Sequence, residues 1–344
     1  MRPLRGSQQL EPAPAKLPDS RKVDRPDGIL AGVTELPAAF TEMVGCRLPV
    51  QLAPMGGGVG GPELAVAVCR AGGLGMLSAS HPMPVADQLR QVRAQTAAPV
   101  GVGFFTFDLP ARMADLETAA SLARVVDLFW GDPDAAVVER IHAGGALAFW
   151  QVGSCEEATA AADAGCDAVV AQGVEAGGHV RGTTPLLELL EQVVARAPVP
   201  VVAAGGIAAA DRVRHVFAAG ASAVRVGTRL LATRESAAHP DYLRALLAAS
   251  GRDTELTTAF GVGWEDAPHR VLRVALHAAA TAPDPVAHAA FLGQEWDVPR
   301  YATQPPSTSC SGHVAAMAMY AGTGVEHITA VSSAAEVIEQ LLSW

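Results

Sequence analysis

The sequence predicts an α/β protein built as a (β/α)8 TIM barrel, with a helical cap inserted after the eighth strand. Three observations support this fold: short apolar runs alternate with alanine-rich helical stretches, eight such runs start 21 to 32 residues apart, and each is apolar throughout. Strands of a closed parallel barrel are buried on both faces, which explains their continuous apolar character. A doubly wound open sheet is the alternative, because a strand count from one sequence can err by one or two.

Eight segments are expected to form the strands. Each is six or seven residues long, close to the usual length of a strand, and a stretch of good helix formers follows it. The expected strands are residues 49–55, 74–80, 99–105, 125–130, 146–152, 168–173, 200–206 and 223–229.

Composition divides the chain into three parts. Residues 1–30 are rich in proline and charge, and we expect a flexible polar tail there. Residues 31–235 and 305–344 are expected to form the barrel. Residues 236–304 carry no strand repeat, so we expect them to form a helical cap over the barrel mouth, where a substrate would bind.

Turn-forming residues set the ends of the helices in this cap. Gly251 and the Ala-Pro-Asp-Pro of residues 282–285 are the breaks. The cap helices are therefore expected over residues 242–250, 267–280 and 287–296. Two more helical stretches are expected around Gly322-Thr-Gly324, where the chain would return to close the barrel.

Charge and hydropathy exclude several classes of function. The net charge of −10 and the isoelectric point near 5.4 argue against a nucleic-acid-binding surface. The charge-free apolar run of residues 197–210 is too short to span a membrane, and the N-terminal residues lack the apolar core of a secretory signal. We therefore expect a soluble cytoplasmic protein without nucleic-acid or membrane partners. The sequence leaves homo-oligomerisation open.

Lysine and cysteine usage narrows the chemistry further. The only lysines are Lys16 and Lys22, both in the polar tail, so Schiff-base, pyridoxal-phosphate and P-loop chemistry lack their essential residue. The five cysteines form no CxxC pair, and no histidine–carboxylate cluster is visible. These features predict a reducing compartment, no disulfide framework and no metal site.

A glycine-rich segment after the first expected strand resembles a dinucleotide-binding fingerprint. Gly56-Gly-Gly58-Val-Gly-Gly61 satisfies GxGxxG, but the next strand ends in Ser80-His81 rather than in the acidic residue that such a fold requires. We interpret the segment as a glycine-rich βα loop that lets a flat ligand lie against the backbone.

The ends of the seventh and eighth expected strands indicate a phosphate site. Gly205-Gly206 ends the seventh strand and precedes a helix, and Gly227-Thr228 ends the eighth. In barrels, backbone N–H groups at these two places form a common phosphate cradle, to which Thr228 can add a hydroxyl donor. A single glycine pair is often only a turn, but two on consecutive units favour a ligand site.

The loop after the sixth expected strand carries a candidate catalytic histidine. His179 follows two glycines on the functional face of the barrel, where an imidazole can donate a hydrogen bond to a small anion or take its proton. Gln172 ends the same strand and offers both a donor and an acceptor to a heteroaromatic ring. The alternatives are a histidine satisfied in the core or at the surface, and a glutamine that fills a barrel layer.

Five glycine- and alanine-rich motifs follow one another along the chain: Ala53-Pro54-Met55, Ala71-Gly-Gly-Leu-Gly75, Ala171-Gln-Gly-Val-Glu-Ala-Gly-Gly-His179, Ala203-Ala-Gly-Gly-Ile207 and Val226-Gly-Thr-Arg-Leu-Leu-Ala-Thr233. In this order they are similar to motifs of nitronate monooxygenases, formerly called 2-nitropropane dioxygenases. The resemblance runs from about Leu36 to the C-terminus, some nine-tenths of the chain, and the ordered set is specific although each motif alone is weak. Weaker matches lie at Glu235-Ser236, His239, Tyr242 and Tyr320-Ala-Gly322.

The resemblance implies an FMN-dependent barrel enzyme that oxidises alkyl nitronates, or nitroalkanes, with O2 to a carbonyl compound and nitrite. His179 matches the catalytic histidine of that family, which would hydrogen-bond the nitro group or remove the α-proton of a neutral nitroalkane. The positions that match FMN contacts and the phosphate cradle are Ala53, Pro54, Met55, Gly103, Gln172, Gly177, Gly178, Gly205, Gly206, Arg225, Val226, Gly227 and Thr228.

Two positions depart from the family pattern and concern the substrate more than the fold. Gly103 stands where many members carry an asparagine, so a side-chain donor is missing there. The loop after His179 is one residue longer than usual and carries Arg181, which either attracts an anionic substrate or points to solvent.

Two other functions fit the same motifs. An FMN-dependent NAD(P)H enoyl-thioester or quinone reductase of the same superfamily shares the histidine loop, although those reductases tend to carry a glutamate where this chain has Gln172. A non-catalytic flavin-binding protein is the second alternative. His179 together with a complete phosphate cradle argues against it.

Overall fold

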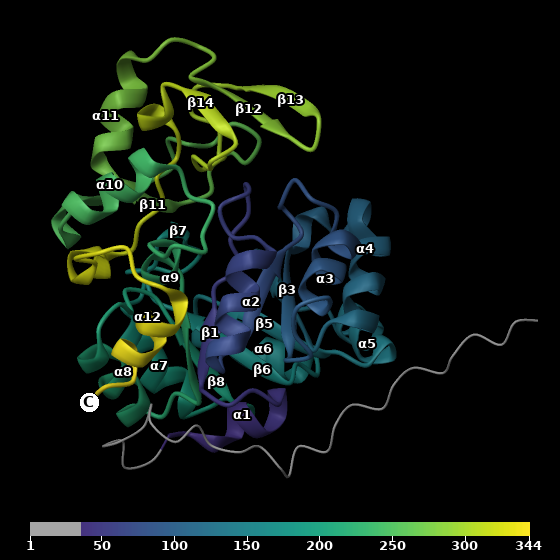
Figure 1. The fold of residues 1–344 in the computed structure, drawn as a ribbon. Coiled ribbons are helices and arrows are strands. Elements are labelled where there is room, and N and C mark those ends of the chain that lie inside the picture. The colour runs from purple at the N-terminus through teal and green to yellow at the C-terminus, as the bar shows by residue number, and fades with distance from the viewer. Residues whose placement is uncertain (1–35) are drawn as a thin grey trace, which may run out of the picture.

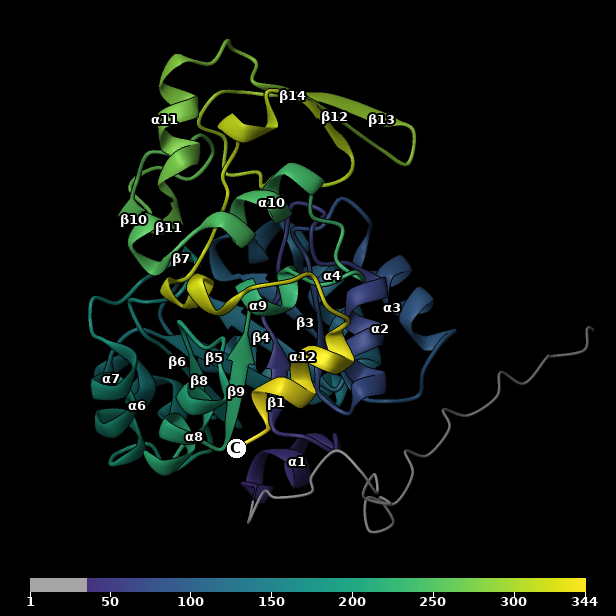
Figure 2. The ribbon, with the colours of Figure 1, turned by 60° about the vertical axis from the view of Figure 1, so that its left-hand side comes forward.

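Eight parallel strands close into a barrel in the computed structural model, which describes residues 36–344 (Figures 1 and 2). The expected tail, residues 1–30, lies outside the described residues. Neighbouring strands follow the order β1-β9-β8-β6-β5-β4-β3-β2, and the N–H of Leu74 donates to Val50 at 2.8 Å, joining the last strand to the first. The strands are β1 (Val50–Leu52), β2 (Gly75–Ser78), β3 (Val100–Phe105), β4 (Val125–Phe129), β5 (Leu147–Val152), β6 (Ala168–Gln172), β8 (Val201–Ala204) and β9 (Ala223–Val226).

The predicted barrel is thereby confirmed, and each strand falls inside its expected segment. An open doubly wound sheet is excluded because β1 pairs with β9 and bridges to the segment before β2. The strands are short because only three to six residues of each apolar run enter the ladder. Except in β3 and β5, which reach the end of their runs, the last residues of each run form the loop at the carboxyl end of the strand.

Helices cover the outside of the barrel and follow the strands in alternation. Local sequence sets their ends: the carboxylate of Asp134 accepts from the N–H of Ala136 at 2.8 Å to begin α5, and Gly145 ends it with a left-handed φ of 93°. The helices are α1 (Ala38–Val44), α2 (Pro62–Ala71), α3 (Val85–Arg93), α4 (Leu109–Leu122), α5 (Ala135–Gly144), α6 (Cys155–Asp163), α7 (Leu186–Val194), α8 (Ala210–Ala218) and α9 (Thr228–Leu231).

The last helix, α12 (Ala334–Leu341), returns to the barrel wall between α8 and α2 (Figure 2). It begins with a capping box, in which Ser333 and Glu336 each bond the other's backbone N–H. Its apolar face, including Val337 and Leu341, is buried in the barrel's core. Because α9 is only one turn long and leads into the cap, α12 takes the place of the eighth barrel helix. The helical return predicted for the C-terminal residues is therefore present.

A cap sits at the carboxyl ends of the barrel strands and has its own apolar core (Figure 1). It contains the expected helices α10 (Pro240–Ala248) and α11 (Arg273–Thr281), together with two small antiparallel sheets. One sheet is formed by β10 (Thr254–Thr257), β11 (His269–Leu272) and β7 (Gly178–His179); the other by β12 (Ala287–Phe291), β13 (Gln294–Val298) and β14 (Cys310–Gly312).

One helix prediction in the cap is wrong, and a second begins too early. Residues 287–296 form most of the β12–β13 hairpin, whose turn at Leu292-Gly293 has positive φ values of 48° and 79°. Successive residues of β12 alternate between buried and exposed, and this period-two pattern prevails over the helix propensity of its alanines. The helix expected over residues 267–280 begins only at Arg273, after β11. In residues 313–344 the first helical stretch is reduced to short 3₁₀ turns.

A membrane-spanning helix and a cluster of metal ligands are both absent from the described residues. None of their helices is long and apolar enough to cross a membrane. Within residues 36–344, no three His, Cys, Asp or Glu side chains gather as the ligands of a metal ion would. All five cysteines are buried and free.

Candidate active site

A cavity of about 900 Å³ opens between the cap and the carboxyl ends of the barrel strands. Its lining includes the last residue of β2, β6 and β8, and the loop that follows β9. Barrel enzymes keep their chemistry at this face, and the volume lies at the upper end of the range of about 300–1,000 Å³ that is typical of small-molecule sites.

The glycines predicted to cradle a phosphate line one end of this cavity. Gly205 and Gly206 have φ values of 120° and 65°, which favour glycine. A Cβ on Gly206 would lie 3.0 Å from that of Glu175 and 3.1 Å from the hydroxyl oxygen of Thr323, so a side chain here would crowd the neighbouring loops. Gly227 and Thr228 line the same end, and the Thr228 hydroxyl accepts from the N–H of Gly322 at 3.0 Å.

Two segments far apart in sequence meet beside this cradle. A Cβ on Gly177 would lie 2.5 Å from the nitrogen of Gly322, and a Cβ on Gly324 would lie 2.5 Å from the oxygen of Gly206. Only glycine permits such close backbone packing. The loop that carries the candidate histidine is thus held against the segment returning from the cap, and Gly178 lines the cavity next to it.

His179 enters the cavity because its loop pairs with a strand of the cap. In β7, His179 lies opposite His269 of β11, and the side-chain nitrogen of Gln172 donates to the His179 carbonyl at 3.0 Å. The Nε2 atom of His179 and the Oε1 atom of Gln172 are both buried without a hydrogen-bond partner in the described structure. Buried polar atoms are seldom left unsatisfied, so this pair indicates a ligand position.

Burial, reinforced by the neighbouring His269, lowers the pKa of His179 to about 3. His269 is itself fixed in one neutral form: its Nδ1 donates to Ala267 at 2.8 Å and its Nε2 accepts from Phe260 at 3.2 Å. Burial also lowers the pKa of His269. At neutral pH the cavity therefore contains an uncharged His179 imidazole, which can donate one hydrogen bond and accept another.

Aromatic rings surround His179 on its open side. Trp264, from the cap loop, stacks on the imidazole with ring centroids 3.8 Å apart and planes inclined by 18°. Trp130 meets the same imidazole edge-on at 5.9 Å. Four of the rings that line the cavity, here called the aromatic wall, come from both the barrel and the cap: Phe105, Phe107, Phe129 and Trp264.

Arg225 lines the cavity from the interior of the barrel. Its guanidinium lies in the barrel interior, where it donates to both carboxylate oxygens of Asp127 and to the side-chain oxygens of Gln51 and Gln151. The Arg225 and Asp127 side chains are 3% and 1% exposed. The pair forms a polar floor of the cavity.

The remaining predicted positions also find definite places. Ala53, Pro54, Met55 and Gly103 line the cavity, and a Cβ on Gly103 would lie 2.5 Å from that of Pro54, so Pro54 fills the space of a larger side chain. Val226 is fully buried in the core, and its carbonyl accepts from the N–H of Ala53 at 2.9 Å. Val226 therefore positions the first loop without lining the cavity.

Arg181 neither faces the cavity nor points freely to solvent. It pairs with Glu157 at 2.5 Å and with Asp132 at 2.7 Å. Arg181 therefore neither attracts an anionic substrate nor points to solvent, as the two alternatives from the sequence had it. Its ion pairs connect the longer loop after His179 to the neighbouring barrel loops.

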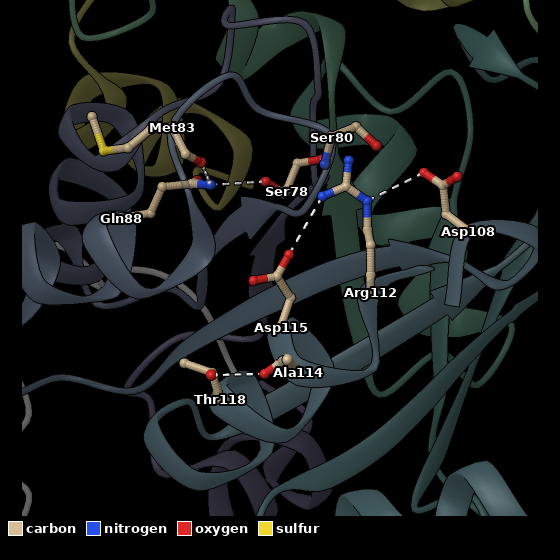
Figure 3. Close-up of polar contacts among 9 residues, drawn as sticks. All are labelled: Ser78, Ser80, Met83, Gln88, Asp108, Arg112, Ala114, Asp115 and Thr118. Carbon is tan, nitrogen blue, oxygen red and sulfur yellow. Dashed lines mark hydrogen bonds and ion pairs between the residues drawn. The ribbon is translucent and has the colours of Figure 1, made fainter. Parts of the chain in front are cut away.

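Near the cavity opening, α4 contributes an arginine held between two acids (Figure 3). Arg112 lies 3.3 Å from Asp108 and 3.4 Å from Asp115, and its φ and ψ of −121° and 21° interrupt the helix. Beside it, the Gln88 amide donates to the carbonyls of Ser78 and Met83 at 3.0 and 2.8 Å and stabilises the loop after β2.

Sequence reasoning missed several of these residues. Trp264 and His269 reach the site only through the β7–β11 pairing, which no local pattern announces. Asp127 did leave a signal, because a lone carboxylate inside the apolar run 125–130 is costly unless an arginine pairs with it.

The fold and site together define a class: a parallel-barrel enzyme whose carboxyl face combines a glycine cradle with a buried histidine. The chain belongs to the nitronate monooxygenase family, whose model matches residues 38–121 and 111–343. It is accordingly a flavin-dependent oxidoreductase.

Individual relatives carry more than one name. A nitronate monooxygenase of Paraburkholderia phytofirmans is 31% identical over 272 residues, covering 64% of this chain and 73% of that protein. A Rhodococcus jostii protein is 33% identical over 249 residues, covering 71% of this chain and 68% of that protein. Its name is (3aS,4S,5R,7aS)-5-hydroxy-7a-methyl-1-oxo-octahydro-1H-indene-4-carboxyl-CoA dehydrogenase.

Solved structures that resemble this chain also carry more than one name. FabK from Thermotoga maritima matches with a TM-score of 0.71 and 27% identity, covering 88% of this chain and 94% of that one. The nitroalkane oxidase of Streptomyces ansochromogenes matches with a TM-score of 0.69 and 30% identity, covering 88% and 96%. The barrel and the cap are therefore shared with several relatives, and the choice among reactions depends on the site.

Proposed function

We propose that the protein is an FMN-dependent nitronate monooxygenase, which oxidises alkyl nitronates with O2 to a carbonyl compound and nitrite. One observation carries the proposal: the unpartnered Nε2 of His179 and Oε1 of Gln172 lie in the same cavity as the glycine cradle. The five buried free cysteines fit a cytoplasmic enzyme.

The residues of the cavity fit FMN. Its phosphate would lie on the loops of Gly206 and Thr228, which line the cavity and offer backbone N–H groups. The Gln172 Oε1 needs a donor, and the edge of an isoalloxazine ring carries one. When bound, the flavin supplies the redox chemistry, accepting electrons from the substrate and passing them to oxygen.

The chain's own residues bind and orient the nitronate. A neutral His179 with its proton on Nε2 donates a hydrogen bond to a nitronate oxygen, and Trp264 covers the imidazole and excludes water. A pKa near 3 makes His179 a weak base. This supports hydrogen bonding to a preformed nitronate over removal of the α-proton from a neutral nitroalkane.

The test is nitrite release from propane 2-nitronate by FMN-loaded protein, measured together with oxygen uptake. Wild-type protein should release nitrite, and His179→Asn should keep FMN while losing about 10²-fold or more in kcat/KM. Absence of nitrite from wild-type protein that holds FMN would reject the proposal.

The second candidate function is an enoyl-thioester reductase. The relative from Rhodococcus jostii favours it, because its name is that of a CoA-thioester dehydrogenase. The same loaded protein should then oxidise NADH or NADPH rapidly in the presence of an enoyl-CoA. We expect this rate to be negligible beside nitronate turnover; a reversed ratio would select the reductase.

A further inference from the structure

We propose that the preferred substrate is a nitronate with a planar, apolar body and no second anionic group. This inference rests on the proposed function and specifies which nitronates the site accepts. It follows from two features of the cavity: every cation that lines it is already paired with a carboxylate, and the aromatic wall stands beside His179.

The charged groups of the cavity leave a net negative balance. Five residues of the described chain that line it carry full charges: Asp108, Arg112, Asp115, Asp127 and Arg225. Burial raises the pKa of Asp127, and the paired Arg225 guanidinium acts against that rise. With Asp127 ionised in this pair, three carboxylates against two guanidiniums give −1. The lining histidines add no positive charge, since burial lowers the pKa of both His81 and His179.

Neither arginine is available to a second carboxylate on the substrate. Arg225 already donates to Asp127, Gln51 and Gln151 inside the barrel. Arg112 lies between Asp108 and Asp115 (Figure 3), so an incoming anion would meet two carboxylates for one guanidinium. Like charges across a binding surface act against the ligand, which disfavours a dianion such as propionate 3-nitronate.

The aromatic wall suits a flat apolar body. The rings of Phe105 and Phe107 stack with centroids 5.4 Å apart and planes 11° from parallel, and the Trp264 ring lies 4.7 Å from each. Phe107 is 48% exposed, so part of its face remains for a ligand to cover. Covering it with an aromatic ring removes apolar surface from water and adds a ring–ring contact.

Binding of unreactive isosteres tests this preference without turnover. Phenylacetate replaces the nitronate of an aryl substrate by a carboxylate, and succinate does the same for propionate 3-nitronate. Titration of FMN-loaded protein, followed by tryptophan fluorescence and flavin absorbance, should show phenylacetate binding at least about tenfold more tightly than succinate. Succinate binding equal to or tighter than phenylacetate would overturn the inference.

Two variants assign the preference to its causes. Trp264→Ala should weaken phenylacetate binding about tenfold and leave succinate unchanged. Val262→Ala is the matched control, because Val262 is on the same cap loop, is 49% exposed and does not line the cavity. Loss of phenylacetate binding in both variants, or in neither, contradicts a role for the Trp264 ring.

The charge argument has its own variant. Asp115→Asn raises the charge of the cavity from −1 to zero and should tighten succinate binding several-fold. Asp87→Asn is the control, since the Asp87–Arg90 pair is outside the cavity and changes the net charge of the protein equally. If succinate binding tightens equally in both variants, the effect comes from the net charge of the whole protein. If it tightens in neither, Asp115 does not repel a second carboxylate of the ligand.

The two proposals fail separately. Nitrite release with succinate preferred over phenylacetate would reject the substrate class and keep the reaction. Phenylacetate preferred without nitrite from any nitronate would reject the reaction and keep the selectivity of the cavity.

Discussion

At the residue scale, His179 shows how burial decides chemistry. The same imidazole on the surface would titrate near neutrality, but here the surrounding rings and His269 keep it uncharged. Its value to the reaction is then a directed hydrogen bond in a dry cavity. Gln172 helps to position it by bonding its carbonyl.

Burial of a neutral His179 also makes folding pH-dependent. Because its pKa falls from 6.5 to about 3 on folding, the unfolded chain binds a proton that the folded chain does not, and stability is lost as the pH falls from 6.5 towards 3. Between pH 7 and 4.5 this amounts to about 2 kcal/mol in the free energy of unfolding.

The measurement is urea unfolding at both pH values. His179→Asn should lose about 2 kcal/mol less than wild type over this range, whereas His277→Asn, at an exposed position, should lose as much as wild type. Identical losses in His179→Asn and wild type would contradict the buried neutral state.

The pair of Arg225 and Asp127 makes a second prediction at this scale. Arg225→Met leaves a carboxylate in the barrel interior without its cation and should cost about 3–5 kcal/mol of unfolding free energy. The double change Arg225→Met with Asp127→Leu removes both charges and should recover most of that loss in denaturant melts. Equal stability of the single and double variants would show that the pair is not coupled.

At the element scale, the glycine cradle combines a strained backbone with close approach to a ligand. Gly206→Ala should weaken FMN binding at least about tenfold, because the added methyl projects toward Glu175 and Thr323 where two loops meet. Fluorescence titration of the apoprotein with FMN measures the effect.

Gly145→Ala is the control for backbone strain alone. Gly145 has a φ of 93°, and a Cβ there would meet nothing within 4 Å. Both variants should lose about 1 kcal/mol of stability, but only Gly206→Ala should lose FMN. Comparable FMN affinity in the two would locate the phosphate elsewhere.

The elements differed in how far the sequence could predict them. Apolar strands and amphipathic helices of the barrel follow from local patterns, and all eight strands were found. The β12–β13 hairpin was missed because its alanines favour a helix until the sheet selects alternate faces. The two-residue strand β7 has no pattern of its own, so the meeting of His179 with His269 and Trp264 required the fold.

The site residues divide in the same way, into those with a local sequence signal and those placed by long-range contacts. Glycines after β8 and β9 are conspicuous in sequence because they end apolar strands, and they do line the cavity. The side chain of Arg225 could not be placed, since its partners Gln51, Asp127 and Gln151 come from three other strands. Long-range pairing of this kind leaves no trace in local spacing.

At the scale of the whole molecule, the cavity exists because the chain leaves the barrel and comes back. After β9 it builds the cap, crosses the mouth near Gly322, and ends in α12 against the barrel wall (Figures 1 and 2). The barrel contributes the cradle and the histidine loop. Trp264 and Tyr320 come from the cap side, so neither part forms the cavity alone.

The most direct test of the central claim is an anaerobic absorbance spectrum of the FMN-loaded protein, taken before and after adding an alkyl nitronate. The account predicts that the nitronate bleaches the flavin bands, that His179→Asn bleaches far more slowly, and that admitting air restores the bands with release of nitrite. A spectrum unchanged by nitronate but bleached by NADH or NADPH would contradict the account and identify a reductase.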